Sequence, residues 1–468
     1  MSRRHEIIIE HPSNFEETDV ARGRSLIASE IKEILAEGRK QELLDFLKEQ
    51  SPHDIAAYIE DLDPDTIADI VLNLGPPIGP DAFQKLPTDL QVEVLEEMSR
   101  NDGARLLEGM DPDERADLVK ALPEEEAEKI LPLIEQAKRN EIARLVTYEE
   151  GTAGSVMTTE YAALPESLTI TEALSELRKI APDRDTLYNI YVVDDQRRLV
   201  GVIPLKDIFV QPSLARLKQV MRKDVISVKA TDDVEEVARK ARDYDLVSIP
   251  VVDEEGRLIG IVTIDDIVDV FEEEATEDMY HYGAIDEHVR YLPSNPIWLA
   301  RQRVVWLILL AAVGFISGAV IDRYESIITS VFALAIFIPV INASGGNAGT
   351  QASTVIIRGL ATGEISLADS LKIFWKEIVV GLSVGVVVAL VGALRGYLLG
   401  HNIRLALTVG LAMIAVVTFA TVLGAVLPLV FKRLKLDPAV VSGPFIASVL
   451  DVVALLIYLE IARLILKL

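Results

Sequence analysis

The C-terminal part of the chain contains a series of long runs without charged side chains, and this series limits the possible folds more than any other feature. The runs cover 304–321, 326–357, 378–394, 405–431 and 438–459, the last with a single charge at Asp451. About 20 apolar residues form a helix that crosses a bilayer. The runs therefore predict a transmembrane domain of five helices over 297–468, because buried helices of water-soluble proteins do not occur in such series.

Charge separates this apolar part from the rest of the chain. The first 296 residues hold 65 acidic and 33 basic residues, a net charge of −32, and the remainder holds 8 acidic and 13 basic residues, a net charge of +5. A nucleic-acid partner is excluded, because its binding surface would be basic. The chain has no cysteine, which excludes disulfides, thiolate metal sites and a cysteine nucleophile.

An odd number of spans places the two ends of the chain on opposite sides of the membrane. Eight lysine or arginine residues border the spans on the side of the soluble part, and five border them on the other side. This bias favours a cytoplasmic soluble part, and the first ten residues lack the apolar run of a signal peptide. We therefore expect a multi-pass protein of the cytoplasmic (inner) cell membrane, in contact with its lipids.

Two of the runs carry polar groups that are costly in contact with lipid. The second run contains Pro339 and the polar, glycine-rich segment 342–351, which predicts a bent helix lining a polar path or, alternatively, a glycine-rich contact between helices. Asp451 lies midway along the fifth run, where an ionised carboxylate costs several kcal/mol unless it is paired or hydrated. A passing cation would pair it; the alternative is a protonated structural aspartate. Pro444 nearby frees a backbone carbonyl that suits hard cations.

Residues 30–150 have helical periodicity and two Asp-Pro pairs that mark helix starts. Asp63-Pro64 and Asp111-Pro112 each predict an N-cap aspartate followed by proline at the first helical position. We expect an acidic, all-α array of short helices without an evident catalytic group. A flexible N-terminus over 1–29 is expected to precede it.

Residues 152–276 contain an internal repeat. Apolar runs lie at 191–194 and 199–203 in the first copy and at 250–253 and 258–262 in the second, with helical patterns at 171–179 and 233–242. Each copy predicts an α/β unit of strand, helix, two hairpin strands and helix. The pattern resembles tandem cystathionine-β-synthase (CBS) domains, here 151–213 and 214–264. Such pairs commonly bind adenosine nucleotides through Thr-x-x-Asp after the last strand; Thr263 and Asp266 match it, which makes ATP a candidate ligand, whereas the first copy has Pro204.

A strongly acidic stretch, 265–296, joins the repeat to the first span. Several of its acids, including Asp266, Asp269 and Glu277, recur at helical spacing on one face. Like charges at that spacing repel and weaken a helix. The stretch is either a solvated linker helix or a helix that needs cations to be stable and therefore senses them.

The order of these parts resembles the MgtE family of magnesium channels and transporters. The membrane motifs that carry the resemblance are Gly345-Gly-Asn-Ala-Gly-Thr-Gln351 and Asp437-Pro-Ala-Val-Val-Ser-Gly-Pro-Phe445, followed by Asp451. The resemblance covers 30–468. It implies a homodimer whose pore lies on the two-fold axis between the second and fifth spans, and a plug helix over 265–296.

The resemblance also implies two sets of metal-binding residues. The pore set is Asp451, the backbone carbonyls of Ala447 and Gly443, and the polar residues Asn342, Asn347 and Thr350. The regulatory set is Asp113, Asp117, Glu235, Asp245, Asp266, Asp269, Glu274, Glu277, Asp278 and Asp437. Oxygen ligands of these kinds suit Mg²⁺, which prefers octahedral oxygen coordination and sheds water reluctantly.

The function that follows is Mg²⁺ import through a channel that closes when cytosolic Mg²⁺ bridges the acidic faces of the soluble part. Mg²⁺ is then both the transported ion and the regulatory ligand. The main alternative is an ion-coupled secondary divalent-metal transporter with Asp451 as the coupling carboxylate. A chloride channel with CBS domains should show cationic pore sites, and an enzyme should show a nucleophile–base pair or a phosphate loop; neither pattern stands out. A Mg²⁺ receptor that does not transport also stays open, and the sequence does not decide selectivity over Mn²⁺, Co²⁺ or Ca²⁺.

Overall fold

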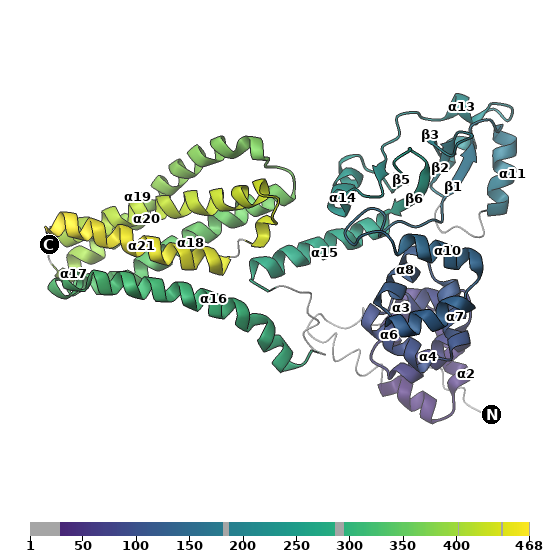
Figure 1. Ribbon diagram of the computed structural model, residues 1–468, viewed down its shortest axis with the longest axis horizontal. Coiled ribbons are helices and arrows are strands. Elements are labelled where there is room, and N and C mark those ends of the chain that lie inside the picture. The colour runs from purple at the N-terminus through teal and green to yellow at the C-terminus, as the bar shows by residue number, and fades with distance from the viewer. Residues whose placement is uncertain (1–28, 181–186, 286–293, 401, 441–442, 468) are drawn as a thin grey trace, which may run out of the picture. The chain divides into compact units, whose positions relative to one another are not determined.

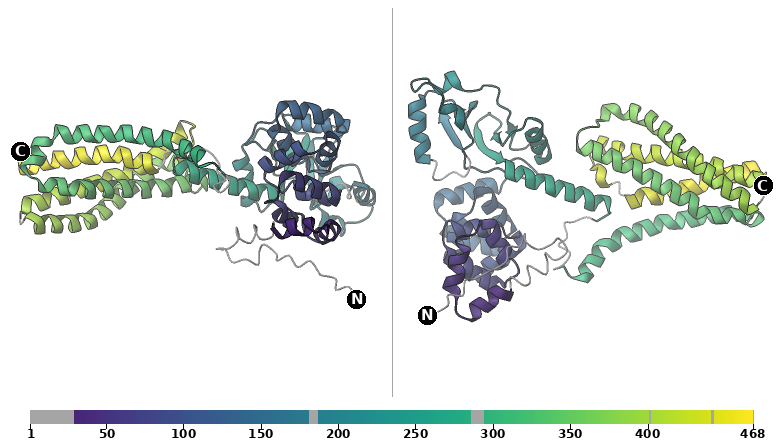
Figure 2. Two further views of the ribbon diagram at one scale, coloured as in Figure 1. Left: turned by 90° about the horizontal axis from the view of Figure 1, so that it is seen from below. Right: turned by 180° about the vertical axis from the view of Figure 1, so that it is seen from behind.

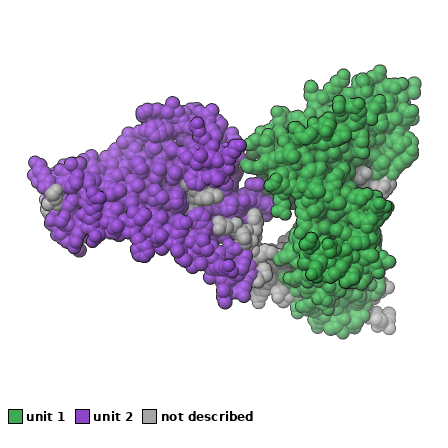
Figure 3. All heavy atoms as spheres, viewed as in Figure 1, with its two compact units in different colours: residues 1–271 green, residues 272–468 purple. Residues whose placement is uncertain are grey.

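The computed structural model describes residues 29–180, 187–285, 294–400, 402–440 and 443–467. Its helices and strands are labelled in Figure 1 and are seen from two further sides in Figure 2. The chain divides into two compact units, residues 1–271 and 272–468 (Figure 3). Of the stretch 1–29, which the sequence predicts to be flexible, residues 1–28 lie outside the described residues, and residue 29 is helical.

The first unit begins with an array of short helices whose apolar faces share one core. A helical segment at 29–36 is followed by α2 (Lys40–Leu47), α3 (Pro52–Ile59), α4 (Pro64–Leu74), α5 (Ile78–Phe83), α6 (Thr88–Glu97), α7 (Arg100–Gly109), α8 (Pro112–Ala121), α9 (Glu124–Ile130), the 3₁₀ turn η2 (Leu131–Leu133) and α10 (Gln136–Leu145). Ile55, Leu107 and Leu118 lie in the hydrophobic cluster that these helices enclose. The predicted all-α array is confirmed.

The two Asp-Pro pairs begin helices as predicted, with Asp63 and Asp111 at the N-cap positions, although neither side chain makes a capping hydrogen bond. α4 and α8 start at the expected prolines, and neither Asp63 nor Asp111 accepts a hydrogen bond from the first turn. Asp111 instead accepts a hydrogen bond from Gln84 Nε2 at 2.5 Å and donates its backbone N–H to Gln84 Oε1 at 2.9 Å. The Asp111 carboxylate thus accepts a hydrogen bond from Gln84, in the turn after α5, while the residue keeps its N-cap position.

The CBS repeat folds into two three-stranded sheets with the same topology. The first contains β1 (Ala162–Pro165), β2 (Asn189–Val193) and β3 (Leu199–Pro204), and the second contains β4 (Val228–Lys229), β5 (Ser248–Val252) and β6 (Leu258–Thr263). In each sheet the first two strands are parallel, and the last two form the predicted antiparallel hairpin. Helices α11 (Ile170–Ile180), α12 (Leu205–Ile208), α13 (Leu217–Val220) and α14 (Val234–Asp243) complete the pair. A hydrophobic cluster containing Tyr191 and Leu258 joins the two copies.

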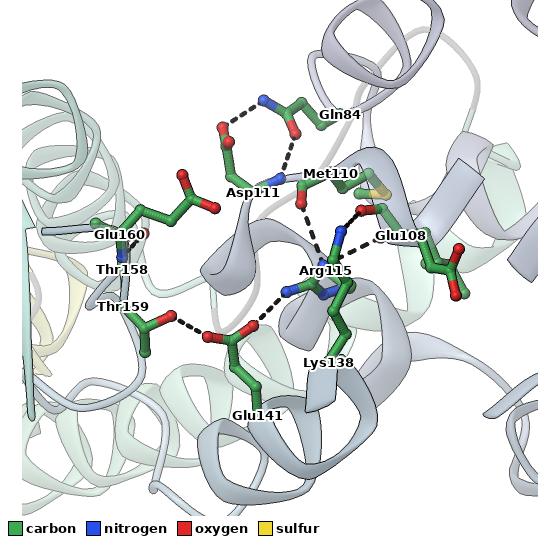
Figure 4. A network of polar contacts seen from close by, with 11 residues as sticks. Gln84, Glu108, Met110, Asp111, Arg115, Lys138, Glu141, Thr158, Thr159 and Glu160 are labelled. Atoms are coloured by element: carbon green, nitrogen blue, oxygen red, sulfur yellow. Dashed lines mark hydrogen bonds and ion pairs between the residues drawn. The ribbon is translucent and has the colours of Figure 1, made fainter. Parts of the chain in front are cut away.

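A buried arginine ties the helical array to the CBS pair (Figure 4). Arg115 in α8 is 2% exposed, and its Nη2 donates to Glu141 Oε2 in α10 at 2.7 Å. Glu141 also accepts a hydrogen bond from the hydroxyl of Thr159, which lies in the segment before β1. Arg115 further donates to the carbonyl oxygens of Leu107 and Met110. The network fixes α8, whose first turn carries the acidic residues considered below.

Helix α15 (Ile264–Tyr282) starts directly after β6 and crosses the boundary between the two units. Its buried residues Ile267 and Val270 pack in the core of the second CBS domain. The helix ends at Tyr282, and Ala284 beyond it has a φ of +58°. The predicted acidic connecting helix is therefore helical over 264–282, and its part at 286–293 lies outside the described residues.

The second unit is a bundle of long helices. They are α16 (Pro296–Arg323), α18 (Ala333–Ala361), α19 (Ser370–Gly400), α20 (Ile403–Arg433) and α21 (Gly443–Leu466), with short segments α17 (Glu325–Ser330), η4 (Leu367–Asp369) and η5 (Pro438–Val440). Ile341 of α18, Val416 of α20 and Tyr458 of α21 share one buried cluster. In the described part of the chain, the helices over 296–323, 367–399, 403–433 and 443–466 are long and apolar enough to cross a membrane.

The second predicted run differs from a single long span. The run 326–357 is divided between the short helix α17 and the 29-residue helix α18. The run is longer than one crossing needs, and its first residues form α17. Pro339 lies inside α18. This helix has the length of a span, but its polar segment makes it less apolar than the other four, and a fifth crossing stays a prediction.

Candidate functional site

Acidic residues from α8 and α15 lie close together in the first unit. Asp113 lies in the first turn of α8 and Asp266 in the first turn of α15. Burial raises the pKa of Asp113 well above its ordinary value, and the negative charge of Asp266 raises it further. The Oδ1 atom of Asp113 is buried without a hydrogen-bond partner in the described structure. Two such carboxylates repel each other and offer hard oxygen donors to a cation.

Lys85 places a positive charge beside these acids, and no sequence pattern pointed to it. Its Nζ lies 3.5 Å from Glu114 Oε1. Burial lowers the pKa of Lys85, but the negative charges of Glu114 and then Asp111 outweigh burial and raise it. Burial also raises the pKa of Glu114. A single lysine therefore offsets only part of the negative charge on this face.

Three further predicted regulatory residues lie elsewhere in the first unit. Asp117 follows one turn after Asp113 in α8, where burial raises its pKa and Lys120 pairs with it at 3.4 Å. Glu235 lies in the first turn of α14. Asp245 is exposed directly after that helix, with a φ of +52°. These residues come from two different domains, so a shared role in one site stays a prediction.

A second acidic group forms at the C-terminal end of α15, within the second unit. Burial raises the pKa of Asp278, and the charges of Asp437 and Glu277 raise it further. His281 Nδ1 lies 2.9 Å from Asp437 Oδ2, and its Nε2 lies 3.8 Å from Glu277 Oε1. The structure thus brings three predicted regulatory acids together around one histidine, which the sequence did not indicate.

The predicted nucleotide residues Thr263 and Asp266 lie at the start of α15, and the remaining predicted acids Asp269 and Glu274 follow along the helix. The Thr263 hydroxyl donates to the Asp266 carboxylate, which also accepts the Thr263 backbone N–H at 3.2 Å. A cleft of about 460 Å³ is lined by residues that include Tyr188, Thr263 and Asp269. Glu274 is half-buried further along the helix. Over the described residues, no three histidine, aspartate or glutamate side chains are grouped closely enough to form a metal centre.

The glycine-rich segment of α18 packs closely against α20 and α21. A Cβ atom on Gly346 would lie 3.6 Å from the Cβ of Ala447 in α21. A Cβ on Gly349 would collide with Leu450, and the carbonyl oxygen of Gly349 fills the space beside Gly424 of α20. The glycines therefore serve the helix contact, which was the alternative interpretation of this segment.

The polar residues of α18 occupy other positions on the same helix. Asn347 is exposed in the single chain, whereas Asn342 and Thr350 are half-buried. The Oδ1 atom of Asn342 is buried and has no hydrogen-bond partner among the described residues. The segment thus combines a close helix contact with polar side chains available to a second surface or to water.

Asp451 lies in α21, half-buried, and Ala447 lies one turn before it. Within the described chain no residue pairs with or hydrogen-bonds to its carboxylate. The candidate pore residues are brought together in part: Ala447 faces Gly346, and a Cβ on Gly443 would lie 3.3 Å from Thr350 Cγ2. The same Cβ would lie 3.4 Å from the hydroxyl of Tyr282, at the end of α15.

Three comparisons place these features among known proteins. Residues 338–461 match the MgtE family, described as divalent cation transporters, residues 50–151 match the MgtE intracellular N domain, and 153–211 and 217–273 match the CBS domain. The magnesium transporter MgtE of Thermus thermophilus is 43% identical over 343 residues, 73% of this chain and 76% of the relative. That of Enterococcus faecalis is 36% identical over 327 residues, 70% and 72% of the two chains. A crystal structure of the soluble part of a magnesium transporter is 32% identical, covers 54% of this chain and 99% of its own, and has a TM-score of 0.50.

The raised pKa of Asp113 predicts a pH dependence of stability in metal-free buffer. A carboxyl group with a raised pKa binds more protons folded than unfolded, so its contribution falls as pH rises above the unfolded value of about 3.9. We expect the thermal unfolding midpoint of the first unit, measured on the full chain in EDTA, to fall as pH rises through the weakly acidic range. Asp113→Asn should flatten this dependence. An equally steep dependence in Asp113→Asn would contradict the assignment.

Proposed function

We infer that this chain, which belongs to the MgtE family of magnesium transporters, carries Mg²⁺ across a membrane and is a transporter rather than an enzyme. The observation that best supports a cation path is Asp451. Its carboxylate lies in the first half of the apolar helix α21, half-buried and without a partner in the described chain. A carboxylate in that position needs a cation or water beside it.

We propose that the pore lies between two copies of the chain. One chain supplies a single Asp451, whereas two copies facing each other across a two-fold axis would match the charge of a divalent ion. Asn342, Asn347 and Thr350 on α18 would add oxygen atoms, as would the backbone carbonyls of Gly443 and Ala447. These neutral oxygens suit a hydrated Mg²⁺ ion, because Mg²⁺ retains much of its water shell. The close packing of α18 against α21 supports this proposal. It would bring the oxygen ligands of α18 next to Asp451 and the backbone carbonyls of α21.

We propose that Mg²⁺ on the side of the soluble part closes the pore through α15, which we call the plug helix. Two acidic groups support this role: Asp113 with Asp266 at its start, and Glu277, Asp278 and Asp437 at its end. Burial and mutual repulsion disfavour the charged form in both groups. A divalent ion would relieve that repulsion, so Mg²⁺ binding would favour the closed arrangement and shift the population toward it.

The remaining predicted acids would extend these two groups. Asp117, Glu235, Asp245, Asp269 and Glu274 contribute negative charge on the helical array, the second CBS domain and the plug helix. Their carboxylate oxygens fit Mg²⁺ chemically. We further propose that the soluble part is cytoplasmic and that the protein lies in the cell membrane, as the excess of basic residues on that side of the spans indicates.

A nucleotide site in the second CBS domain is a second proposal. Thr263 is buried and its hydroxyl is bonded to Asp266, at the edge of a cleft also lined by Tyr188 and Val247. The cleft offers an aromatic ring and a hydroxyl–carboxylate pair, which suit a base and a ribose. We propose that ATP binds there.

Asp451→Asn should reduce Mg²⁺ flux by at least about ten-fold, because a charge-assisted interaction of roughly 1.5–3 kcal/mol is lost. The measurement is Mg²⁺ uptake by proteoliposomes with low Mg²⁺ on the side of the soluble part. Asp322→Asn, which neutralises an exposed acid at the end of α16, is the matched control and should retain flux. Wild-type flux in Asp451→Asn, or wild-type flux that requires a proton or sodium gradient, would contradict the pore proposal.

The combined variant Asp113→Asn, Asp266→Asn, Asp278→Asn and Asp437→Asn should keep its flux when millimolar Mg²⁺ is added on the side of the soluble part. The reason is that the carboxylates to be bridged have been removed from both groups. The same uptake assay measures this.

The control for that variant removes the same amount of charge from exposed positions of the helical array. It carries Glu93→Gln, Glu96→Gln, Glu124→Gln and Glu125→Gln. Inhibition by Mg²⁺ should be as in the wild type. Equal loss of inhibition in both variants would show that total charge, and not the two acidic groups, sets the response.

Thr263→Val should weaken ATP binding by about ten-fold, because one hydrogen bond to the ligand is lost and the buried Asp266 loses its hydroxyl partner. Isothermal titration of the full chain in detergent measures the affinity. Thr88→Val, at an exposed position of the helical array, should bind ATP as the wild type does. Unchanged binding in Thr263→Val would contradict the site.

A further inference from the structure

The end of the plug helix contacts the candidate pore helices through one side chain, Tyr282. Its hydroxyl lies 2.7 Å from Thr354 Oγ1 and donates to the carbonyl oxygen of Thr350 at 3.2 Å, both in α18. Thr354 in turn donates to the same carbonyl at 2.8 Å. All of these residues belong to the second unit.

The same tyrosine ring also covers the start of α21. A Cβ atom on Gly443 would lie 3.4 Å from Tyr282 Cζ and 3.4 Å from its hydroxyl oxygen. The ring therefore lies beside the first residue of α21, separated from it by about the space of one methyl group. One side chain thus touches both helices that carry the candidate pore residues, and Figure 1 shows the end of α15 beside the start of α21.

The neighbouring residue fixes the segment that precedes α21. His281 Nδ1 lies 2.9 Å from Asp437 Oδ2, one residue before η5. Asp437 Oδ1 also accepts the backbone N–H of Ala439 at 2.9 Å. His281 therefore contacts the segment before α21, and the next residue, Tyr282, contacts α18. The Tyr282 contact involves no charged group.

We propose that Tyr282 is a positioning residue that holds the plug helix against the pore helices and sets how completely the channel closes. This inference rests on the proposed gating by the plug helix. The contact consists of neutral hydrogen bonds and ring packing, so it does not depend on bound Mg²⁺. Mg²⁺ would remove the repulsion between acids, and Tyr282 would supply the attraction that then keeps the plug helix docked.

The test compares Tyr282→Phe with the wild type, because phenylalanine keeps the ring against Gly443 and removes the hydroxyl. The readout is the Mg²⁺ flux that remains at saturating Mg²⁺ on the side of the soluble part, divided by the flux at low Mg²⁺ in the same preparation. We expect this ratio to rise roughly five-fold, as the loss of a typical hydrogen bond from the closed state implies. The thermal unfolding midpoint should stay close to the wild-type value.

Two further variants separate a specific contact from a general disturbance. Thr354→Val should raise the ratio in the wild-type background and have no further effect in Tyr282→Phe, because the two hydroxyls act as one pair. Tyr244→Phe, which removes the hydroxyl of an exposed tyrosine in the CBS pair, should leave the ratio unchanged.

The outcomes distinguish the inference from the function on which it rests. If wild-type flux is not inhibited by Mg²⁺, the proposed gating fails. If the wild type is inhibited and Tyr282→Phe shows the same residual ratio, gating stands and the role of Tyr282 is overturned. Additive effects of Tyr282→Phe and Thr354→Val would likewise overturn the pairing of their hydroxyls.

Discussion

A carboxylate inside an apolar, membrane-spanning helix requires a cation or water beside it, and Asp451 in α21 imposes this requirement on the second unit. In the described chain no hydrogen bond or ion pair involves its carboxylate, which is why we propose an ion from outside the chain as its partner. The glycines of α18 pack against α20 and α21 and keep the polar side chains of α18 close to α21. The packing of α18, α20 and α21 thus holds Asp451 in place, and we propose that an ion reaches its carboxylate there.

In the soluble part, too, carboxylates lie where water does not fully screen their charge, and here there are many of them. Its net charge is −32, and where acids are buried, at the start of α8 and at the end of α15, the repulsion is stronger than it would be in water. Lys85 and His281 are placed beside these groups and offset only part of the charge. Such repulsion inside the folded structure is the basis of the proposed regulation, because a single bound divalent ion would neutralise two carboxylates at once. Tyr282 contributes an uncharged attractive contact between the end of α15 and α18, which opposes the repulsion between the acids.

Most of the fold follows from sequence patterns whose physical basis is local. Charge-free runs, the CBS repeat and the acidic stretch correctly predicted the kinds of elements and their order, since hydrophobic periodicity and turn residues act over short distances. Asp111 occupies the predicted N-cap of α8, but the sequence did not indicate that Gln84, distant in sequence, would hydrogen-bond to its carboxylate. The division of the second run into α17 and α18 was also missed. Residues such as Arg115, Lys85 and Tyr282 had no local signal, because their roles arise only when separate elements pack together.

Closure of the pore by Mg²⁺ from the side of the soluble part alone is the central proposal. The direct measurement uses proteoliposomes in which the protein has a single orientation, with Mg²⁺ flux recorded while Mg²⁺ is varied independently on each side. We predict that flux falls steeply as Mg²⁺ rises on the side that carries the soluble part and shows only ordinary saturation on the other side. Equal inhibition from both sides, or undiminished flux at millimolar Mg²⁺ on the side of the soluble part, would contradict the account.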